Sequence, residues 1–480
     1  MYTVHPINIL IDNETPFDSI ELLSIFKALQ DHSTLELSGI LPFDDNKDVS
    51  ALSWTGKPIE VRFSEELNPE KSKNVFWGII TKVTLIKSGQ NIQCSLVANS
   101  LSIKLDKKKH IRFFQDPNKT YNDVLEHILK SYSKYVKLVD SNSFTSRKIE
   151  KMLIQYNETD WEFILRVCRR MQSLCFLADE DSPTKIYLET QKTDSLKIDN
   201  FEISKDDESK IVLLELDELY LLGDKLIFLN KDYVIESVKH IFQDNTIISN
   251  YQLKSENLNF ENSDISNLTG VLLKAKVKDN KDEENLGRIK IEFEGEDLWP
   301  NSRYFPLTTS YSSSENHEGV GFFSLPEIDE TVLVSFDNSY EDKAIINCVL
   351  REKSDKRLAD PTHKIWRNRK GREFKITDDN ISISANDKYV FIECNDDEIK
   401  LINKDCLIKQ TKNDVMIEYQ NSRIKLNEKN ILLQCGSAFL RIQDGKVEIT
   451  DGKGAKISLN GSLKVEGNEV SIKGSVIKLN

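Results

Sequence analysis

Residues 414–449 read DVMIEYQNSRIKLNEKNILLQCGSAFLRIQDGKVEI, a repetitive segment from which the architecture can be inferred. Apolar residues recur in pairs spaced i, i+2, and runs of Asn, Asp, Gly, Lys and Ser separate the pairs. A period of two is that of a β-strand with one apolar and one polar face. The pattern extends from Gly371 to Asn480 in units of about eight residues, each one short strand plus a turn. The pairs are Phe374/Ile376, Ile381/Ile383, Val390/Ile392, Ile399/Leu401, Val415/Ile417, Ile424/Leu426, Ile431/Leu433, Leu440/Ile442, Val447/Ile449, Ile457/Leu459, Leu463/Val465, Val470/Ile472 and Ile477/Leu479.

The apolar face of these strands needs a cover. A single-chain β-helix needs roughly 20 or more residues per coil, whereas a unit of about eight residues makes only one wall. A thin sheet with one bare apolar face is unstable in water, so other copies must supply the remaining walls. Three chains wound into a triangular prism would bury every pair and leave no open strand edge. The alternative is a long antiparallel meander packed on another domain. The prism predicts core positions at Ile399, Leu401, Ile424, Leu426, Ile431, Leu433, Val447, Ile449, Ile457, Leu459, Val470 and Ile472.

The composition narrows the classes of partner. The chain has 480 residues, of which 39% are apolar and 30% charged, and its net charge is −13. Three copies would carry three times that charge, which repels nucleic acid and anionic lipid, so no nucleic-acid partner is expected. The run Lys107–Lys109 is interpreted as a solvated turn.

Cysteine and histidine usage gives no sign of a disulfide framework, a metal site or a cofactor. The seven cysteines include no C-x-x-C pair, and the seven histidines are scattered without metal-ligand spacing. Cys168 and Cys175 are expected to be buried, reduced thiols. The sequence shows neither a signal peptide nor an apolar stretch long enough to span a membrane, so export would need another route than general secretion.

The order of predicted elements indicates a mainly β protein with five parts. Capping boxes at Thr120–Asp123 and Thr159–Glu162 predict two helices in the second part, and Ile20–Leu29 is predicted as a short helix in the first. Strands are expected in the others, including one at Gly319–Leu325 and a last one at Val476–Leu479. The parts are a small β-barrel at 1–103, an α/β insert at 104–190, a second small barrel at 191–262, a closed barrel of the oligonucleotide/oligosaccharide-binding (OB) type at 268–352, and the prism at 371–480.

The second predicted helix carries three arginines on one face. Trp161, Cys168 and their apolar neighbours are expected to face a core, whereas Arg166, Arg169 and Arg170 share another face. We interpret the arginine face as a solvent-exposed surface that pairs with nearby acidic side chains, rather than as an anion-binding patch.

Two motifs then carry a resemblance to a known family. Residues 155–166 read QYNETDWEFILR, and residues 287–293 read GRIKIEF, followed by GVGFFSLP at 319–326 and VLVSF at 332–336. The first resembles a helix in the hub of VgrG (valine–glycine repeat) spikes of type VI secretion systems and of phage baseplate hubs, and the second resembles the barrel motif of that family. Asp329 stands where the family usually has Gly, and Thr331 where Glu is common. The motif residues are Gln155, Glu158, Thr159, Asp160, Trp161, Phe163 and Arg166 in the hub helix, and Gly287, Arg288, Lys290, Phe293, Pro326, Val332 and Phe336 in the OB barrel.

The resemblance implies a homotrimeric spike of a contractile injection system. It implies two hub barrels per chain on a hexameric Hcp-like tube ring, an OB neck, and an intertwined trimeric β-helix or β-prism as a needle. Implied partners are baseplate proteins, a PAAR-like tip protein, effectors and, transiently, the target membrane. The resemblance places assembly in the bacterial cytoplasm and export by sheath contraction. Whether the system is type VI, a prophage or an extracellular particle stays open. The end of the needle, where the tip protein would bind, is Val476, Ile477, Leu479 and Asn480.

No catalytic motif is readable in the chain. The sequence contains no G-x-S-x-G, H-E-x-x-H or P-loop, and no apolar pocket with two facing carboxylates can be inferred. We therefore expect a structural protein rather than an enzyme such as a cell-wall hydrolase. The remaining alternative is a trimeric receptor- or glycan-binding tail fibre.

Overall fold

The computed structural model describes most of the chain. The described residues are 7–42, 50–65, 68–139, 145–188, 196–197, 202–205, 212–216, 220–228, 231–243, 246–255, 268–296, 299, 302–311, 321–338, 340–356, 359–385, 389–461 and 464–478. The chain forms two compact units, Met1–Leu350 and Arg351–Asn480. Strands dominate both units, as predicted. Within the described ranges, no helix has the length and apolar character needed to cross a bilayer.

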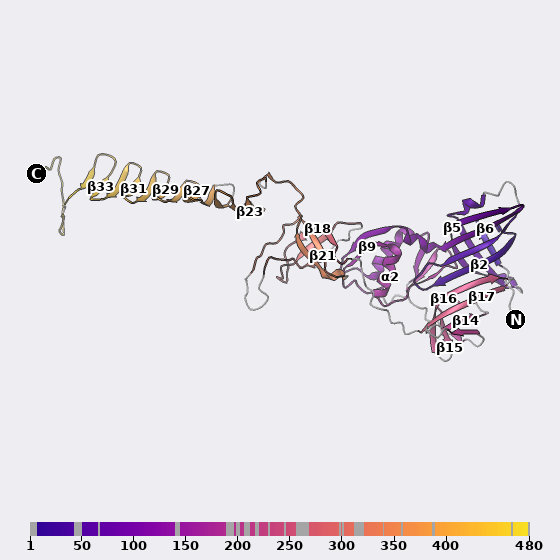
Figure 1. The fold of residues 1–480 in the computed structure, drawn as a ribbon. Helices are drawn as coiled ribbons and strands as arrows, with labels where there is room; N and C mark the ends of the chain where they lie inside the picture. The colour runs from indigo at the N-terminus through magenta and orange to yellow at the C-terminus, as the bar shows by residue number, and fades with distance from the viewer. Residues whose placement is uncertain are drawn as a thin grey trace. The chain divides into compact units, whose positions relative to one another are not determined.

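The largest sheet of the first unit joins strands from both predicted small barrels (Figure 1). Strand β2 pairs antiparallel with β16, which places Leu23 opposite Phe242 and Ala28 opposite Ser237. Each set of strands keeps its own core, one around Leu23 and the other around Tyr251. The two predicted barrels therefore share one continuous sheet. Its strands are β1 Ile7–Ile11, β2 Ser19–Ala28, β3 Thr34–Leu41, β4 Pro58–Glu65, β5 Asn68–Ser88, β6 Asn91–Ser100, β12 Leu196–Lys197, β13 Glu202–Lys205, β14 Val212–Leu216, β15 Lys225–Phe228, β16 Lys231–Gln243 and β17 Thr246–Ser255.

The helix predicted at Ile20–Leu29 is wrong, because this segment is strand β2. Its apolar residues fit either period, but Leu23 and Ile25 are buried while Leu22 and Phe26 are exposed, which is the alternation of a strand. Pairing with β3 on one side and β16 on the other satisfies the backbone of β2. Tertiary pairing overrides the local pattern here.

The α/β insert contains both predicted helices. They are α1 Tyr121–Leu129 and α2 Asp160–Arg170, and the strands are β7 Lys109–Phe114, β8 Val136–Val139, β9 Leu153–Thr159, β10 Phe176–Ala178 and β11 Thr184–Tyr187. Cys168 and Cys175 are buried free thiols in the core of the insert, as predicted. Lys107–Lys109 are exposed, also as predicted. The first unit also has short 3-10 turns at Ser50–Trp54, Leu101–Asp106 and Lys130–Tyr132.

A five-stranded antiparallel sheet forms the OB part of the first unit. Its order is β20-β19-β18-β21-β22, and the 3-10 turn Glu341–Lys343 precedes the last strand. The predicted strand at Gly319–Leu325 is not formed over its described residues, 321–325, because this segment makes only an isolated bridge. The strands are β18 Leu272–Asp279, β19 Ile289–Phe293, β20 Tyr304–Phe305, β21 Thr331–Phe336 and β22 Ala344–Val349.

The second unit is a single antiparallel sheet of twelve consecutive strands, the needle sheet (Figure 1). Strands β26 to β33 begin at Val390, Glu398, Cys406, Asp414, Ser422, Asn430, Ala438 and Lys446, so each starts eight residues after the one before. Two-residue turns join most of them, and Lys404, Gln420, Gly436 and Gly445 have the positive φ that such turns require. The strands are β23 Lys364–Arg367, β24 Glu373–Ile376, β25 Ile381–Ala385, β26 Val390–Cys394, β27 Glu398–Asn403, β28 Cys406–Thr411, β29 Asp414–Tyr419, β30 Ser422–Asn427, β31 Asn430–Cys435, β32 Ala438–Gln443, β33 Lys446–Thr450 and β34 Lys456–Leu459.

Strand register arranges the apolar face of the needle sheet in three columns. The central column is Trp366, Phe374, Ile383, Ile392, Leu401, Ile408, Ile417, Ile424, Leu433, Leu440, Ile449 and Ile457. The first flank column is Ile376, Ile381, Cys394, Ile399, Gln410, Val415, Leu426, Ile431, Ile442, Val447 and Leu459. The second flank column is Ala385, Val390, Asn403, Cys406, Tyr419, Ser422, Cys435 and Ala438.

The opposite face of the needle sheet carries charged residues together with some apolar ones, among them Leu432, which is 6% exposed. Lys409 pairs with Glu398 at 2.5 Å, Lys425 with Asp414 at 2.8 Å and Lys456 with Glu448 at 2.8 Å. Neighbouring strands of one chain make all these pairings, so a single copy builds one wall. The strands predicted around Val465, Val470 and Val476 are not formed, since residues 460–461 and 464–478 contain no strand.

Candidate functional site

The hub helix motif forms the corner between strand β9 and helix α2. The Thr159 hydroxyl accepts a hydrogen bond from the Glu162 amide at 3.1 Å, and the Glu162 carboxylate accepts one from the Thr159 amide at 2.8 Å. Thr120 and Asp123 make the same reciprocal contacts at the start of α1. Both capping boxes predicted from sequence are confirmed, and each satisfies two amides that have no partner inside the helix.

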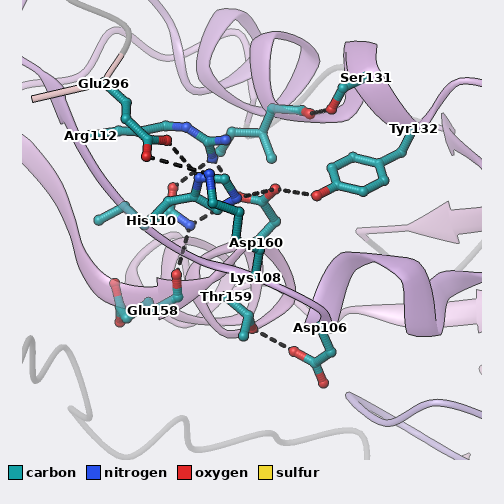
Figure 2. Close-up of polar contacts among 12 residues, drawn as sticks. Asp106, Lys108, His110, Arg112, Ser131, Tyr132, Glu158, Thr159, Asp160 and Glu296 are labelled. Atoms are coloured by element: carbon teal, nitrogen blue, oxygen red, sulfur yellow. Dashed lines mark hydrogen bonds and ion pairs between the residues drawn. The ribbon is translucent and has the colours of Figure 1, made fainter.

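Asp160 is the centre of a buried polar cluster at this corner (Figure 2). Its carboxylate accepts hydrogen bonds from Arg112, from Gln155 Nε2 at 2.9 Å and from the Tyr132 hydroxyl at 2.8 Å. Burial, together with the hydrogen bond to Asp160, raises the pKa of Tyr132 to about 12. Arg112 comes from β7 and also donates to Gln155 Oε1 at 3.0 Å. The cluster therefore ties β7, β9 and α2 together.

Arg166 joins the motif helix to the OB barrel. Its guanidinium donates to both carboxylate oxygens of Glu158, at 2.8 and 2.9 Å, and to Glu341 Oε1 at 2.7 Å. Glu341, in the 3-10 turn before β22, is fully buried and also pairs with Arg170 at 3.1 Å. Burial lowers the pKa of Arg166, but the two carboxylates outweigh this effect and raise the pKa above its usual value.

The interpretation of the arginines as a solvent-exposed face is therefore wrong for Arg166, which is only 3% exposed. The expected acidic partners are present, but one of them, Glu341, lies 175 residues away in the sequence. Arg169 is half-buried and donates to Gln30 at 3.4 Å. Arg166 thus makes a buried contact within the chain.

Aromatic stacking and backbone contacts extend this joint. Phe113 of β7 stacks on Phe293 of β19 with ring centroids 4.6 Å apart. Gly295 allows this approach, because a Cβ there would lie 2.6 Å from the Phe113 ring. Arg303 donates to the backbone carbonyls of Gln115 at 2.9 Å and Ile149 at 2.7 Å. The insert and the OB barrel consequently share one core.

Glu296 of the OB part contacts the insert through His110, beside the Asp160 cluster (Figure 2). His110 Nδ1 lies 2.7 Å from Glu296 Oε2, and this hydrogen bond lowers the pKa of Glu296. His110 Nε2 lies 3.7 Å from Asp160 Oδ2. Sequence reasoning missed His110, Glu296 and Glu341, because none belongs to a local motif.

The remaining apolar residues of the motif pack in the core of the insert. Phe163 stacks on Phe114 at 5.6 Å, and Trp161 lies 4.8 Å from the ring of His32. His32 Nδ1 lies 2.8 Å from Ser102 Oγ, and His32 Nε2 lies 3.1 Å from Asp106 Oδ2. These three side chains are arranged in the order of a Ser-His-Asp triad. Ser102 is fully buried, so no substrate carbonyl can approach its hydroxyl. Asp106 also accepts a hydrogen bond from the Thr159 hydroxyl, which makes this group a further link to α2.

A second buried joint lies between β2 and the segment after β10. Lys27 pairs with the fully buried Asp179 and, at 2.7 Å, with Glu180. Burial lowers the pKa of Lys27, but both carboxylates together raise it above its usual value. His240 of β16 is buried nearby and makes a 2.8 Å hydrogen bond with Ser249 Oγ. Burial, with smaller effects of Lys27 and Lys73, lowers the pKa of His240 to about 3.

The His240 pKa predicts a loss of stability in acid. Unfolding returns this pKa to about 6.5, so the unfolded chain binds the extra proton below that pH. The contribution of neutral, buried His240 to the free energy of unfolding is complete above pH 6.5 and falls as the pH drops toward 3. We expect the free energy of unfolding to fall by about 2–3 kcal/mol between pH 7 and pH 4.5 from this residue alone. Denaturant unfolding of the wild type and of His240→Gln at both pH values checks this, and an equal fall in the two proteins would contradict it.

The OB motif also has a structural role. Phe293, Val332 and Phe336 are buried in the barrel core, Pro326 accepts a hydrogen bond from Asn280 at 2.9 Å, and Lys290 lies over the Tyr304 ring. Gly287 has a φ of 71°, which favours glycine, and Arg288 pairs with Asp282 at 2.8 Å. The loop before β19 is held by these two residues.

Asp329 occupies a backbone conformation that favours glycine. Its φ is 70°, and its amide donates to the Val277 carbonyl at 2.9 Å. Asp adopts this region at a small cost and a β-branched residue at a larger one. We expect Asp329→Gly to raise the free energy of unfolding by about 0.5 kcal/mol and Asp329→Val to lower it by about 1–2 kcal/mol. Denaturant titrations check both values, and a neutral valine variant would show that the turn is not strained.

The predicted prism positions from Ile399 to Leu459 lie on the apolar face of the needle sheet and remain uncovered in one chain. Their side chains are half-buried at most, and Ile449, for example, is 44% exposed. Val470, Ile472, Val476 and Ile477 are exposed outside any strand, whereas Leu479 and Asn480 lie outside the described residues. Among the described residues, no group of His, Cys, Asp and Glu side chains has the geometry of a metal site.

Two family models match the chain, and together they span more than half of it. The model described as phage tail baseplate hub (GPD) matches residues 27–196, and the model described as type VI secretion system/phage-baseplate injector OB domain matches residues 273–350. The chain belongs to the baseplate hub-and-spike family of contractile injection systems. In this hub-and-spike chain, Arg166 of the hub helix motif and Phe293 of the OB motif connect the hub insert to the injector OB domain.

Solved structures show the same fold as this hub-and-spike chain. The E. coli c3393 protein, described as a component of the type VI secretion system with structural similarity to the T4 bacteriophage tail proteins gp27 and gp5, is 13% identical; the match covers 72% of this chain and 100% of that chain, with a TM-score of 0.50. A chain of the half-lidded Francisella PdpA–VgrG complex is 14% identical; the match covers 90% of this chain and 88% of that chain, with a TM-score of 0.52. No curated protein matches the chain.

Proposed function

We propose that this chain is the homotrimeric spike of a contractile injection system. In this role it caps the tail tube, pierces the target membrane and carries a tip protein and effectors. Its role is structural and not enzymatic. Sheath contraction, rather than a site in this chain, supplies the energy.

The uncovered central column of the needle sheet is the observation that carries this proposal. Every strand from β23 to β34 contributes an aromatic or aliphatic residue to it, and one copy leaves them largely exposed. Covering an exposed Ile or Leu contributes about 1–2 kcal/mol, and ten of the twelve strands contribute an Ile or Leu to the column. A three-sided closure covers the column in every copy and leaves the charged face in water.

The buried joints of the first unit support a role under load. Arg166 and Arg170 pair with the buried Glu341, and the half-buried Arg303 donates to backbone carbonyls of the insert, so charged groups connect the insert to the OB barrel. A buried ion pair is costly to separate because each charge would be left without a partner. Force applied to the hub would therefore reach the neck without bending this connection.

The partners follow from the same role. The hub would sit on an Hcp-like tube ring and baseplate proteins, and the end of the needle at Val476, Ile477, Leu479 and Asn480 would hold a PAAR-like tip protein. The similar Francisella structure is that of a PdpA–VgrG complex, which supports partnership with other spike components. The chain would assemble in the bacterial cytoplasm and leave the cell when the sheath contracts.

Electron cryomicroscopy of the contractile particle tests this function. A spike predicts density for three copies on the axis below the tube, with a shaft of roughly 50 Å for twelve strands at their usual spacing. Density for the chain at the periphery of the particle would instead indicate a tail fibre and contradict the proposal.

A further inference from the structure

The two flank columns of the needle sheet are complementary in size, strand by strand. Where the first column has Leu or Ile, the second has Ala, Asn, Ser or Cys. The pairs within one strand are Ile381 with Ala385, Ile399 with Asn403, Leu426 with Ser422, Ile431 with Cys435, and Ile442 with Ala438. In β29 the relation is reversed, since the large Tyr419 of the second column accompanies the smaller Val415.

The small residues of the second column leave a hollow in the apolar face. The hollow has a volume of about 460 Å³, and Tyr419, Ser422, Cys435 and Ala438 line one side of it. At the same levels, β30 to β32, the first column presents Leu426, Ile431 and Ile442, which are 40%, 41% and 40% exposed.

These large residues cannot fill the hollow of their own chain. Ala438 and Ile442 are four residues apart in one strand, which is about 13 Å at the usual rise of a strand. In a cyclic trimer, one edge of each wall meets the opposite edge of the next wall, and rotation without translation keeps both at the same level. The first flank column of one copy then faces the second flank column of its neighbour.

We propose that Leu426, Ile431 and Ile442 of one copy fill the hollow at Ser422, Cys435 and Ala438 of the next copy. This inference rests on the proposed trimer and adds which side chains meet across each of its edges. The partner that fits this surface is a second copy of the chain in equal register. An axial shift by one strand at β28–β30 would place Leu426 beside Tyr419, so large residues would collide and small ones would leave voids.

A bump-and-hole experiment on the full chain tests this packing. Ala438→Phe should lower the Tm of the trimer by roughly 10 °C, because the new ring meets Ile442 of the neighbouring copy. Adding Ile442→Ala makes room for the ring, so the double variant should melt above Ala438→Phe. Adding Ile399→Ala instead, in the same column but at the level of β27, should lower the Tm further.

Three outcomes would overturn the inference. They are an unchanged Tm for Ala438→Phe, equal rescue by Ile399→Ala and Ile442→Ala, and no rescue by Ile442→Ala. If the phenylalanine prevents folding, Ala438→Leu replaces it. This variant is combined with Ile442→Ala and with Ile399→Ala, and the same three outcomes of the melting experiment apply. The mass of the wild-type protein in solution separates the two proposals. A wild-type trimer in which Ile442→Ala gives no specific rescue refutes the packing alone. A wild-type monomer refutes the proposed spike.

Discussion

Replacing Ile431 or Ile457 with aspartate is expected to destabilise the needle more than any other single change in the second unit. Both residues lie on the apolar face and are exposed in one chain, at 41% and 55%. A trimer encloses them, so each substitution places three carboxylates in an apolar interior. An unpaired buried carboxylate costs several kcal/mol in each copy. We expect Tm to fall by roughly 10 °C or more, or the trimer to dissociate, as read by thermal melting and light scattering.

The matched control places the same residue on the other face of the sheet. Lys425 and Lys456 lie on the charged face, where they pair with Asp414 and Glu448. Aspartate at either position remains in water and should cost about 1 kcal/mol or less. If aspartate lowers the Tm equally on the two faces, the apolar face is not enclosed. The inference that this face forms the interior of a trimer would then be wrong.

Glu341→Gln is expected to give the largest effect in the first unit. Glu341 is fully buried and is the shared partner of Arg166 at 2.7 Å and Arg170 at 3.1 Å. Neutralising it removes the carboxylate that Arg166 and Arg170 share, while Glu158 still pairs with Arg166. Breaking a buried ion pair by removing one partner costs about 3–5 kcal/mol. The free energy of unfolding, measured by denaturant titration, should fall by that amount while the needle keeps its assembly.

An exposed ion pair of the same barrel provides the control for Glu341. Glu284 pairs with Arg288 at 3.0 Å, but its side chain is 68% exposed. Glu284→Gln should change the free energy of unfolding by no more than about 1 kcal/mol. A small effect at Glu341, similar to that at Glu284, would show that Glu158 alone is enough for Arg166 and that the joint does not depend on Glu341.

Local sequence patterns predicted the needle well and the first sheet less well. In the needle, each strand pairs with its neighbours in sequence, so the eight-residue period determines both the strands and the apolar face. In the first unit, β2 pairs with β16, more than 200 residues away, and the helical spacing of Leu22, Leu23 and Phe26 gave no sign of that. The strands predicted after β34 are not formed in the described residues 464–478, although the pattern of apolar pairs continues there.

The helix motif shows the same division between local and distant information. The capping box of Thr159 and Glu162 was readable, because both partners lie within one turn. The burial of Arg166 was not, because its partner Glu341 is contributed by another barrel. One signal was present in the sequence: Trp161, Phe163 and Arg166 of α2 lie among apolar residues on several sides, which leaves little helix surface for solvent.

The mass of the full chain in solution distinguishes a trimeric spike from a protein that is stable as a single copy. One chain has a mass of 55.3 kDa, and a spike whose walls are three copies must have three times that mass at working concentration. Static light scattering should give the trimer value for the wild type and a lower value for Ile431→Asp. A wild-type protein that remains at 55.3 kDa would show that one copy protects its own aliphatic columns and would contradict the account.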